Sequence, residues 1–165
     1  MKKQGFTLIE LMVVIVIMGI LAAVAVPKLF GMIAKSKASE VGPAAGTYVK
    51  LQQAYFSERS VAGGWQLIGY MAPSGVAASK TTNFEYTPGS LSVTGETAAS
   101  SLTTAWEAKN VANLNECPAG KNWTVAVQKS ADANKGTDIT FTAKADALGK
   151  AGCVALTPTF DKIGK

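Results

Sequence analysis

The sequence contains no histidine, and only two of its 165 residues are cysteine. The lack of histidine removes the usual general base near neutral pH and the commonest metal ligand in proteins. The sequence also has no nucleophile–base pair, no phosphate-binding glycine loop and no zinc-ligand spacing. We therefore predict that this protein is not an enzyme and that it uses no metal or cofactor.

Charged residues are also scarce, and basic residues outnumber acidic ones only slightly. Charged residues make up 16% of the chain, and the net charge of +5 falls to +3 without Lys2 and Lys3. So small a positive excess predicts no specific nucleic-acid partner. The aspartates of the C-terminal half are scattered and lack the spacing of a calcium-binding loop.

The most informative feature that is present is an apolar run from Phe6 to Val26, which holds a single charge, Glu10. As a helix this run is about 32 Å long, close to the thickness of a bilayer's hydrocarbon core. A carboxylate within such a segment costs on the order of 2.5–3.5 kcal/mol at mid-membrane. Glu10 is therefore a candidate functional residue that needs a partner.

An ordinary secretory signal peptide is the alternative interpretation of this N-terminus. Lys2 and Lys3 provide a positive start, and Ala23-Val24-Ala25 fits the small-x-small cleavage rule. A signal peptide gains nothing from Glu10, however, and the helical pattern continues beyond Pro27. These two features favour a retained helix, and Lys2 and Lys3 favour leaving its N-terminal end in the cytoplasm.

The segment from Lys2 to Glu10, KKQGFTLIE, closely resembles the leader of type IV prepilins and type II secretion pseudopilins. The resemblance extends through Pro27 and, more loosely, to about Ser60. It implies that a prepilin peptidase removes residues 1–5 by cutting between Gly5 and Phe6. The same enzyme would then N-methylate the new amino terminus at Phe6.

Cleavage would leave a positive amine on Phe6 at the positive end of a helix dipole, four residues before Glu10. An amine buried in an apolar bundle needs an anion. Glu10 can reach its own amine or that of a neighbouring subunit, and the family implies the neighbour's. We interpret this assembly salt bridge as a device that sets register, with little net stabilisation.

Gly19 and Pro27 bracket the weakest part of the helix. Glycine weakens a helix by up to about 1 kcal/mol relative to alanine, and proline removes one backbone donor and kinks the helix. An ordinary proline kink is one expectation. The family resemblance implies another, in which residues 20–26 lose helicity in a filament.

After Pro27 the pattern becomes amphipathic through residues 28–60, and Gly42-Pro43 predicts a second bend. We expect one long bent helix, with residues 6–27 in membrane or filament core. Its second half would pack on a sheet through Tyr48, Leu51 and Tyr55.

Residues 61–165 predict an exported β-rich domain, which makes the fold class α+β and pilin-like. Apolar alternation predicts antiparallel strands around Trp123–Gln128 and Ile139–Thr142, joined by a hairpin loop over 131–137. A third strand is expected at Val154–Leu156. Further expectations are a strand at Phe84–Tyr86 or Leu91–Val93 and a short helix over Leu102–Leu114 with Trp106 and Val111 inward.

Cys117 and Cys153 would most simply form one disulfide in an exported domain, although two reduced, packed cysteines are the alternative. The bridge would close a loop of about 37 residues, for which chain entropy gives roughly 4 kcal/mol. It would resemble the disulfide-closed region near the C-terminus of pilins.

Two further features of the sequence are only weak indications of a function. Asn122-Trp123-Thr124 fits the N-glycosylation pattern but adjoins a predicted strand. Trp65, Trp106 and Trp123 could form a sugar-stacking platform, although core packing is the favoured interpretation.

The resemblance implies a structural subunit of a type IV pilus, used for adhesion, twitching motility or DNA uptake. It would be a single-pass protein of the bacterial inner membrane before assembly and part of an extracellular homo-oligomeric filament (fimbrium) afterwards. Its implied partners are the prepilin peptidase and the pilus assembly platform. The alternatives are a type II secretion pseudopilin and a membrane-tethered module, such as a carbohydrate binder, that does not polymerise.

Overall fold

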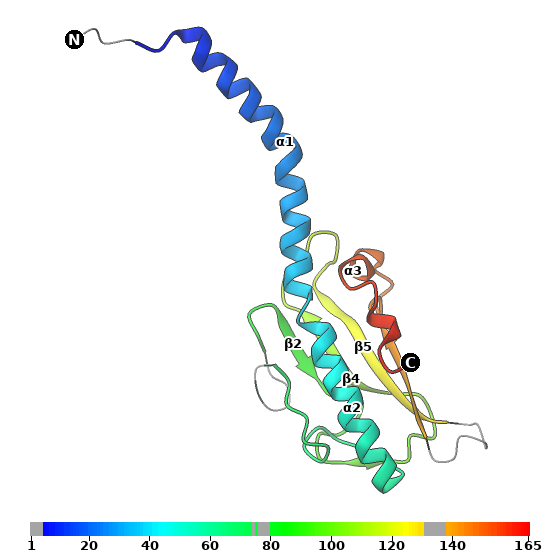
Figure 1. Ribbon diagram of the computed structural model, residues 1–165. Helices are drawn as coiled ribbons and strands as arrows, with labels where there is room; N and C mark the ends of the chain where they lie inside the picture. The colour runs from blue at the N-terminus through cyan, green and yellow to red at the C-terminus, as the bar shows by residue number, and fades with distance from the viewer. Residues whose placement is uncertain (1–4, 74, 76–79, 131–137) are drawn as a thin grey trace.

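The computed structural model describes residues 5–73, 75, 80–130 and 138–165. A long N-terminal helix leads into a small α+β domain, whose sheet packs against the second half of that helix (Figure 1). The elements in chain order are α1 (Leu8–Ala38), α2 (Val41–Arg59), β1 (Ala62–Gly63), β2 (Phe84–Thr87), β3 (Glu96–Thr97), β4 (Thr103–Asn110), β5 (Gly120–Lys129), β6 (Ile139–Lys144), α3 (Ala151–Leu156) and the 3-10 helix η2 (Phe160–Lys162).

The N-terminal helix of the structure confirms the predicted long bent helix. It spans 52 residues, Leu8–Arg59, with a turn at Ser39-Glu40 that separates α1 from α2. The break lies just before Gly42-Pro43 rather than at them. Pro43 falls in the first turn of α2, where backbone N–H groups have no intrahelical acceptor, so its missing donor costs little.

Four strands form the main sheet in the order β2-β4-β5-β6, all antiparallel, and β1 pairs separately with β3. Trp123, Val125 and Val127 on β5 are fully buried, while Thr124 and Gln128 are half-buried on the other face. The predicted strands of this region are thereby confirmed for β5 and β6. The predicted loop over 131–137 lies outside the described residues, and the strands beside it pair Lys129 with Ile139.

Two predicted elements were wrong. Residues 103–110 form strand β4 and not a helix, because buried Trp106 and Ala108 alternate with the outward Glu107 and Lys109 at a period of two. Val111, predicted to point inward, is exposed.

The C-terminal segment holds the second error. Residues 151–156 form helix α3 and not a strand, since two alternating apolar residues are too few to separate the two structures. Gly152 lets α3 lie close to residue 116, because a Cβ there would be 2.5 Å from the Glu116 carbonyl oxygen. Of the two candidate early strands, Phe84–Tyr86 is confirmed as part of β2, and Leu91–Val93 is not a strand.

An aromatic core fills the space between α2 and the sheet. Tyr48 and Phe56 of α2 are buried in this core. All three tryptophans, which lie outside α2, are buried in it as well. Leu51 and Tyr55 lie at its edge, so the predicted packing face of the helix is largely confirmed. Because the tryptophans are fully buried, a sugar-stacking platform built from them is ruled out.

Two buried tyrosines of this core have different hydrogen bonding. The Tyr70 hydroxyl donates to the Ala44 carbonyl of α2 (3.2 Å) and accepts from the Trp106 indole (2.8 Å). Within the described part of the chain, the buried Tyr48 hydroxyl has no hydrogen-bond partner. Burial raises the pKa of Tyr70 to about 12 and also raises the pKa of Tyr48, so both phenols stay neutral near pH 7.

This contrast predicts opposite effects of the same chemical change. Tyr48→Phe removes an unsatisfied buried hydroxyl and should leave the free energy of unfolding unchanged or raise it by about 1 kcal/mol. Tyr70→Phe removes two hydrogen bonds and should lower it by about 1–3 kcal/mol. Denaturant unfolding of the full chain in detergent measures both, and equal losses in the two variants would contradict the assignment.

Candidate assembly interface

The N-terminal part of α1, from Leu8 to Ile33, extends away from the domain as an apolar arm (Figure 1). Only Ala34 and Ala38 of α1 are buried, and every large apolar side chain from Leu8 to Ile33 is exposed. This is the single stretch of the described residues that is long and apolar enough to cross a membrane. An apolar surface of this extent is typical of a lipid or protein interface.

Glu10 caps the helix on which it lies. The Thr7 hydroxyl accepts from the Glu10 N–H (3.4 Å), and the Glu10 carboxylate accepts from the Thr7 N–H (2.8 Å) and hydroxyl. This capping box could have been predicted from the Thr-x-x-Glu spacing. The carboxylate is exposed and can accept further hydrogen bonds, so capping leaves it able to bind a partner.

The other predicted residues of the arm keep separate positions along it. Gly5 and Phe6 are exposed and precede Leu8, the first helical residue. Gly19 has open space around it, and Pro27 lies inside α1. Residues 20–26 between them are helical in this single subunit.

Glu40, which sequence reasoning missed, connects the junction of the two helices to the domain through hydrogen bonds. It lies at the junction of α1 and α2, and its carboxylate accepts hydrogen bonds from the Thr81 and Tyr86 hydroxyls at 2.8 Å each. Burial, and then the hydrogen bond to Glu40, raise the pKa of Tyr86. Together with the Tyr70–Ala44 bond, this contact holds the start of α2 against the domain.

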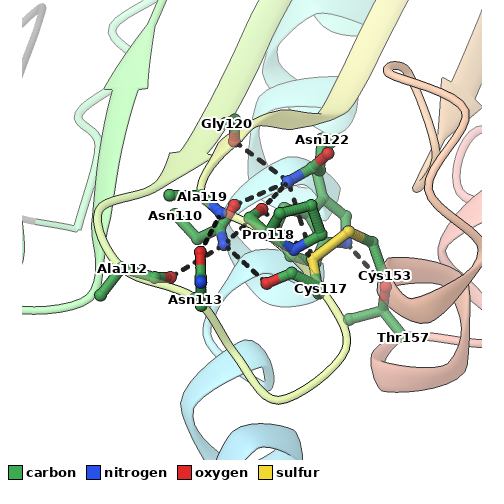
Figure 2. Close-up of a disulfide and its surroundings, with 11 residues drawn as sticks. Asn110, Ala112, Asn113, Cys117, Pro118, Ala119, Gly120, Asn122, Cys153 and Thr157 are labelled. Carbon is green, nitrogen blue, oxygen red and sulfur yellow. Dashed lines mark hydrogen bonds between the residues drawn. A yellow bond between two sulfur atoms is a disulfide. The ribbon is translucent and has the colours of Figure 1, made fainter.

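The Cys117–Cys153 disulfide is present and fully buried, with 36 residues of separation (Figure 2). Beside it lie two buried asparagines: Asn122 donates to the Asn110 side-chain oxygen and to the Pro118 carbonyl, each at 2.8 Å. Asn110 in turn donates to the Pro118 carbonyl at 3.0 Å. Asn122 is therefore a structural residue and is inaccessible as a glycan acceptor.

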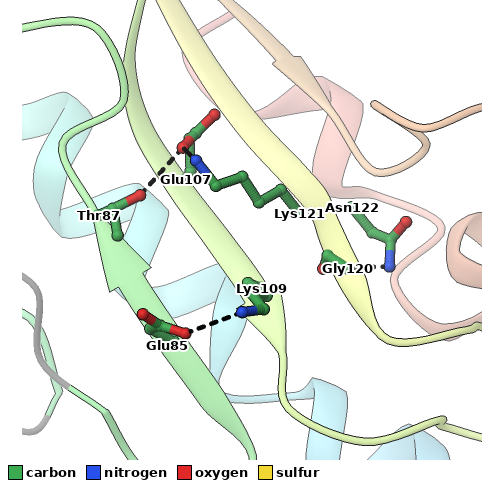
Figure 3. A network of polar contacts seen from close by, with 7 residues as sticks. All are labelled: Glu85, Thr87, Glu107, Lys109, Gly120, Lys121 and Asn122. Atoms are coloured by element: carbon green, nitrogen blue, oxygen red, sulfur yellow. Dashed lines mark hydrogen bonds and ion pairs between the residues drawn. The ribbon is translucent and has the colours of Figure 1, made fainter.

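The outward face of the sheet carries paired charges (Figure 3). Lys109 pairs with Glu85 at 3.2 Å, and Lys121 with Glu107 at 2.7 Å. The Lys109–Glu85 pair is exposed on both sides and contributes about 0–1 kcal/mol. Across residues 5–73, 75, 80–130 and 138–165, no group of three or more histidine, cysteine or acidic side chains could hold a metal ion.

Comparisons with known proteins gave one family-model match and several similar proteins. Residues 1–26 match the family model of the prokaryotic N-terminal methylation motif. The chain is 45% identical over 58 residues to the type IV major pilin protein PilA of Myxococcus xanthus, covering 35% of this chain and 26% of that protein. It is 42% identical over 84 residues to the fimbrial protein EcpC of Eikenella corrodens, covering 51% of this chain and 50% of that protein.

A third relative is matched over a shorter stretch and is also a fimbrial protein. The chain is 56% identical over 39 residues to the type IV major fimbrial protein FimA of Dichelobacter nodosus, which covers 24% of this chain and 25% of that protein. The matched segments thus span a quarter to a half of each relative. No solved structure gave a significant match.

The disulfide should matter for the C-terminal part of the domain. Replacing Cys117 and Cys153 together by serine should lower the free energy of unfolding by roughly 2–5 kcal/mol, since the bridge constrains a long loop of the unfolded chain. Denaturant unfolding without reductant measures this loss. A variant as stable as the parent would show that the bridge contributes little to the stability of this region.

Proposed function

We propose that this protein is a structural, non-catalytic subunit of a type IV pilus. The observation that carries the proposal is an exposed apolar arm with one acidic residue at its start, joined to a folded domain. The methylation motif over residues 1–26 and the pilin and fimbrial names of the relatives support it. Those names favour a pilus subunit over a secretion pseudopilin or a tethered module.

In this proposal residues 1–5 form a leader that a prepilin peptidase removes, and Phe6 becomes the methylated N-terminus. Residues 6–27 lie in the bacterial inner membrane before assembly and in the filament core afterwards. Residues 28–60 continue the helix, and residues 61–165 form the exported domain. The assembly platform would move the arm from the first environment to the second.

Glu10 would pair with the Phe6 amine of a neighbouring subunit. The capping box supports this role, because it holds the carboxylate at the start of α1, close to where cleavage creates the amine. An unpaired amine in an apolar bundle is strongly unfavourable, so subunits that assemble out of register would be penalised. Glu10 would thereby select the stagger between neighbours.

The arm from Gly19 to Pro27 would provide extensibility. Pro27 has no N–H, so the Ala23 carbonyl lacks its i+4 donor, and Gly19 lowers helix propensity at the other end. Melting of residues 20–26 would lengthen the arm, because an extended residue spans about 3.3 Å against 1.5 Å in a helix.

Intact-mass spectrometry of filaments sheared from producing cells tests the proposal. A chain that begins at N-methylated Phe6, and that keeps the disulfide, is the expected result. A chain that begins after Ala25 would show a conventional signal peptide and overturn the proposal. A Phe6 start found only in membranes would instead indicate a subunit that does not polymerise.

A charge-specific test uses Glu10→Gln. Glutamine at this position preserves the capping box, so the helix should start normally, but it cannot form an ion pair with the amine. We expect normal amounts of processed subunit in the membrane and a large loss of sheared filaments. Wild-type filament yield from this variant would show that the charge is dispensable.

Glu10→Asp is the matched control, since it keeps the charge and shortens the side chain by one methylene. It should retain more filament than Glu10→Gln. The reverse order would attribute the effect to capping geometry rather than to charge.

A further inference from the structure

The outward face of the main sheet, on the side away from α2, holds a concave surface that we call the sheet trough. Its volume is about 350 Å³, within the range of about 300–1,000 Å³ that is typical of ligand sites. Figure 3 shows part of it, where Lys121 reaches from β5 to Glu107 on β4. The residues that define the sheet trough are Leu102, Glu107, Lys121, Thr124, Lys144 and Leu148.

An exposed leucine lies at each end of the sheet trough. Leu148 lies against the start of β5, where Gly120 leaves it room: a Cβ on Gly120 would be 2.7 Å from the Leu148 side chain. At the other end, Leu102 precedes Thr103, which pairs with Val127 in the second half of β5. The sheet trough therefore runs along β5, with apolar surface at both ends.

Two β-bulges bring charged side chains into the sheet trough. The register of β4 against β5 shifts twice, at residues 104–106 and at 108–110 of β4. The second shift adds one residue to β5, so Lys121 is exposed on the outward face, whereas strict alternation from the buried Trp123 would turn it toward the core. Its ammonium thereby lies 2.7 Å from the Glu107 carboxylate.

The charged groups of the sheet trough leave a net positive charge. Glu107 already accepts from the Thr87 hydroxyl (3.0 Å) and from Lys121, and its side chain is only 14% exposed. Lys121 is 53% exposed and has further N–H groups to donate. Lys144 is exposed, and among the residues that the structure describes it has no ion-pair partner. An acidic group is therefore the complementary ligand.

Threonine hydroxyls form the rest of the polar surface. Thr104, Thr124 and Thr142 come from three adjacent strands and are half-buried. Ala126 lies in their midst, because it pairs with both Thr104 and Thr142. A hydroxyl can donate and accept, so this row matches the hydroxyl groups of a sugar. Ala126 and the two end leucines offer apolar contact for the C–H groups of a sugar ring.

The backbone beneath the sheet trough argues against an extended peptide as its ligand. Strand β4 pairs with β2 and β5, and β5 pairs with β4 and β6, so the ladder occupies the backbone hydrogen-bonding groups of both strands. Peptides that extend a sheet bind to a free edge. A ligand on this face meets side chains, and most of the polar ones are hydroxyls and ammonium groups.

We propose that the sheet trough binds an acidic polysaccharide whose sugars carry carboxylates, a polyuronate. A uronate carboxylate pairs with the ammonium groups of Lys144 and Lys121. The sugar hydroxyls form hydrogen bonds with the threonines, and the ring C–H groups lie on Leu102 or Leu148. One subunit holds the complete site, and only the avidity described next rests on the pilus function proposed above.

Repetition along a filament compensates for a weak single site. The residues that line the sheet trough include no aromatic side chain on which a sugar could stack, so one sugar unit binds weakly. If the arms form the filament core, α2 lies on the core side of the sheet, and the outward face is turned away from the core. Every subunit then presents the same site to a polymer of repeated sugars, which raises the overall affinity by about 10²–10⁴.

Binding of a short uronate to single subunits tests the site without a filament. In ligand-observed NMR with the full chain in detergent micelles, trigalacturonate should bind. Its methyl ester keeps the sugars but lacks the charge, and it should bind about tenfold more weakly or less. Absence of trigalacturonate binding, or equal binding of the two trimers, would overturn the inference.

A pair of lysine variants tests whether the sheet trough is the binding site. Lys144→Gln should lower the affinity for trigalacturonate about fivefold or more, with the fold unchanged because this side chain is exposed. Lys109→Gln is the matched control, since it removes the same charge from the same face but lies outside the sheet trough. Equal losses in the two variants would show a general charge effect and contradict the assignment.

Co-sedimentation with intact filaments tests the class of polymer. Filaments should carry polygalacturonate into the pellet and leave polyglutamate, an acidic peptide of the same charge sign, in solution. Equal binding of the two would show a surface that attracts any polyanion and overturn the sugar assignment. If no filaments form but trigalacturonate binds in micelles, only the pilus function fails. If filaments form and neither galacturonate probe binds, only this inference fails.

Discussion

The structure depends on the incompatibility of the α1 surface with water. Large apolar side chains from Leu8 to Ile33 are exposed on a helix that contacts the domain only at its base. A bilayer or a bundle of like helices removes this surface from water, and both environments satisfy the helix backbone internally. The proposed membrane and filament states are therefore two solutions of one physical problem, and the rest of the molecule determines how the arm is presented to each.

Presentation of the arm relies on a few polar contacts at the helix junction. The Glu40 carboxylate accepts from Thr81 and Tyr86, and the Ala44 carbonyl accepts from Tyr70. These groups lie at the edge of an aromatic core in which hydrogen bonds are shielded from water and thus gain in strength. The bonds join the start of α2 to β2 and to the chain segments before it, so they hold the helix junction, from which the arm projects, against the domain.

Sequence reasoning succeeded where one strong pattern decided the outcome. The long helix, the strands around Trp123 and Phe141, and the burial of the tryptophans follow from hydrophobic periodicity and side-chain size. It failed for residues 103–110 and 151–156, where local patterns are short and the partners are distant: β4 is defined by pairing with β2 and β5, and α3 by its close approach to Glu116 and its bond to Cys117. The Thr7–Glu10 cap was visible in the sequence and was overlooked.

The sequence by itself determined the apolar arm and its single acidic residue, because these features depend on composition and spacing within one continuous segment. Only the tertiary structure decided which part of the helix is covered. Ala34 and Ala38 face the domain while Phe30 and Met32 do not, since that distinction depends on how α2, the sheet and the disulfide loop meet α1. The contacts of Glu40 and Asn122 are likewise tertiary, because their partners lie in segments that local patterns cannot bring together.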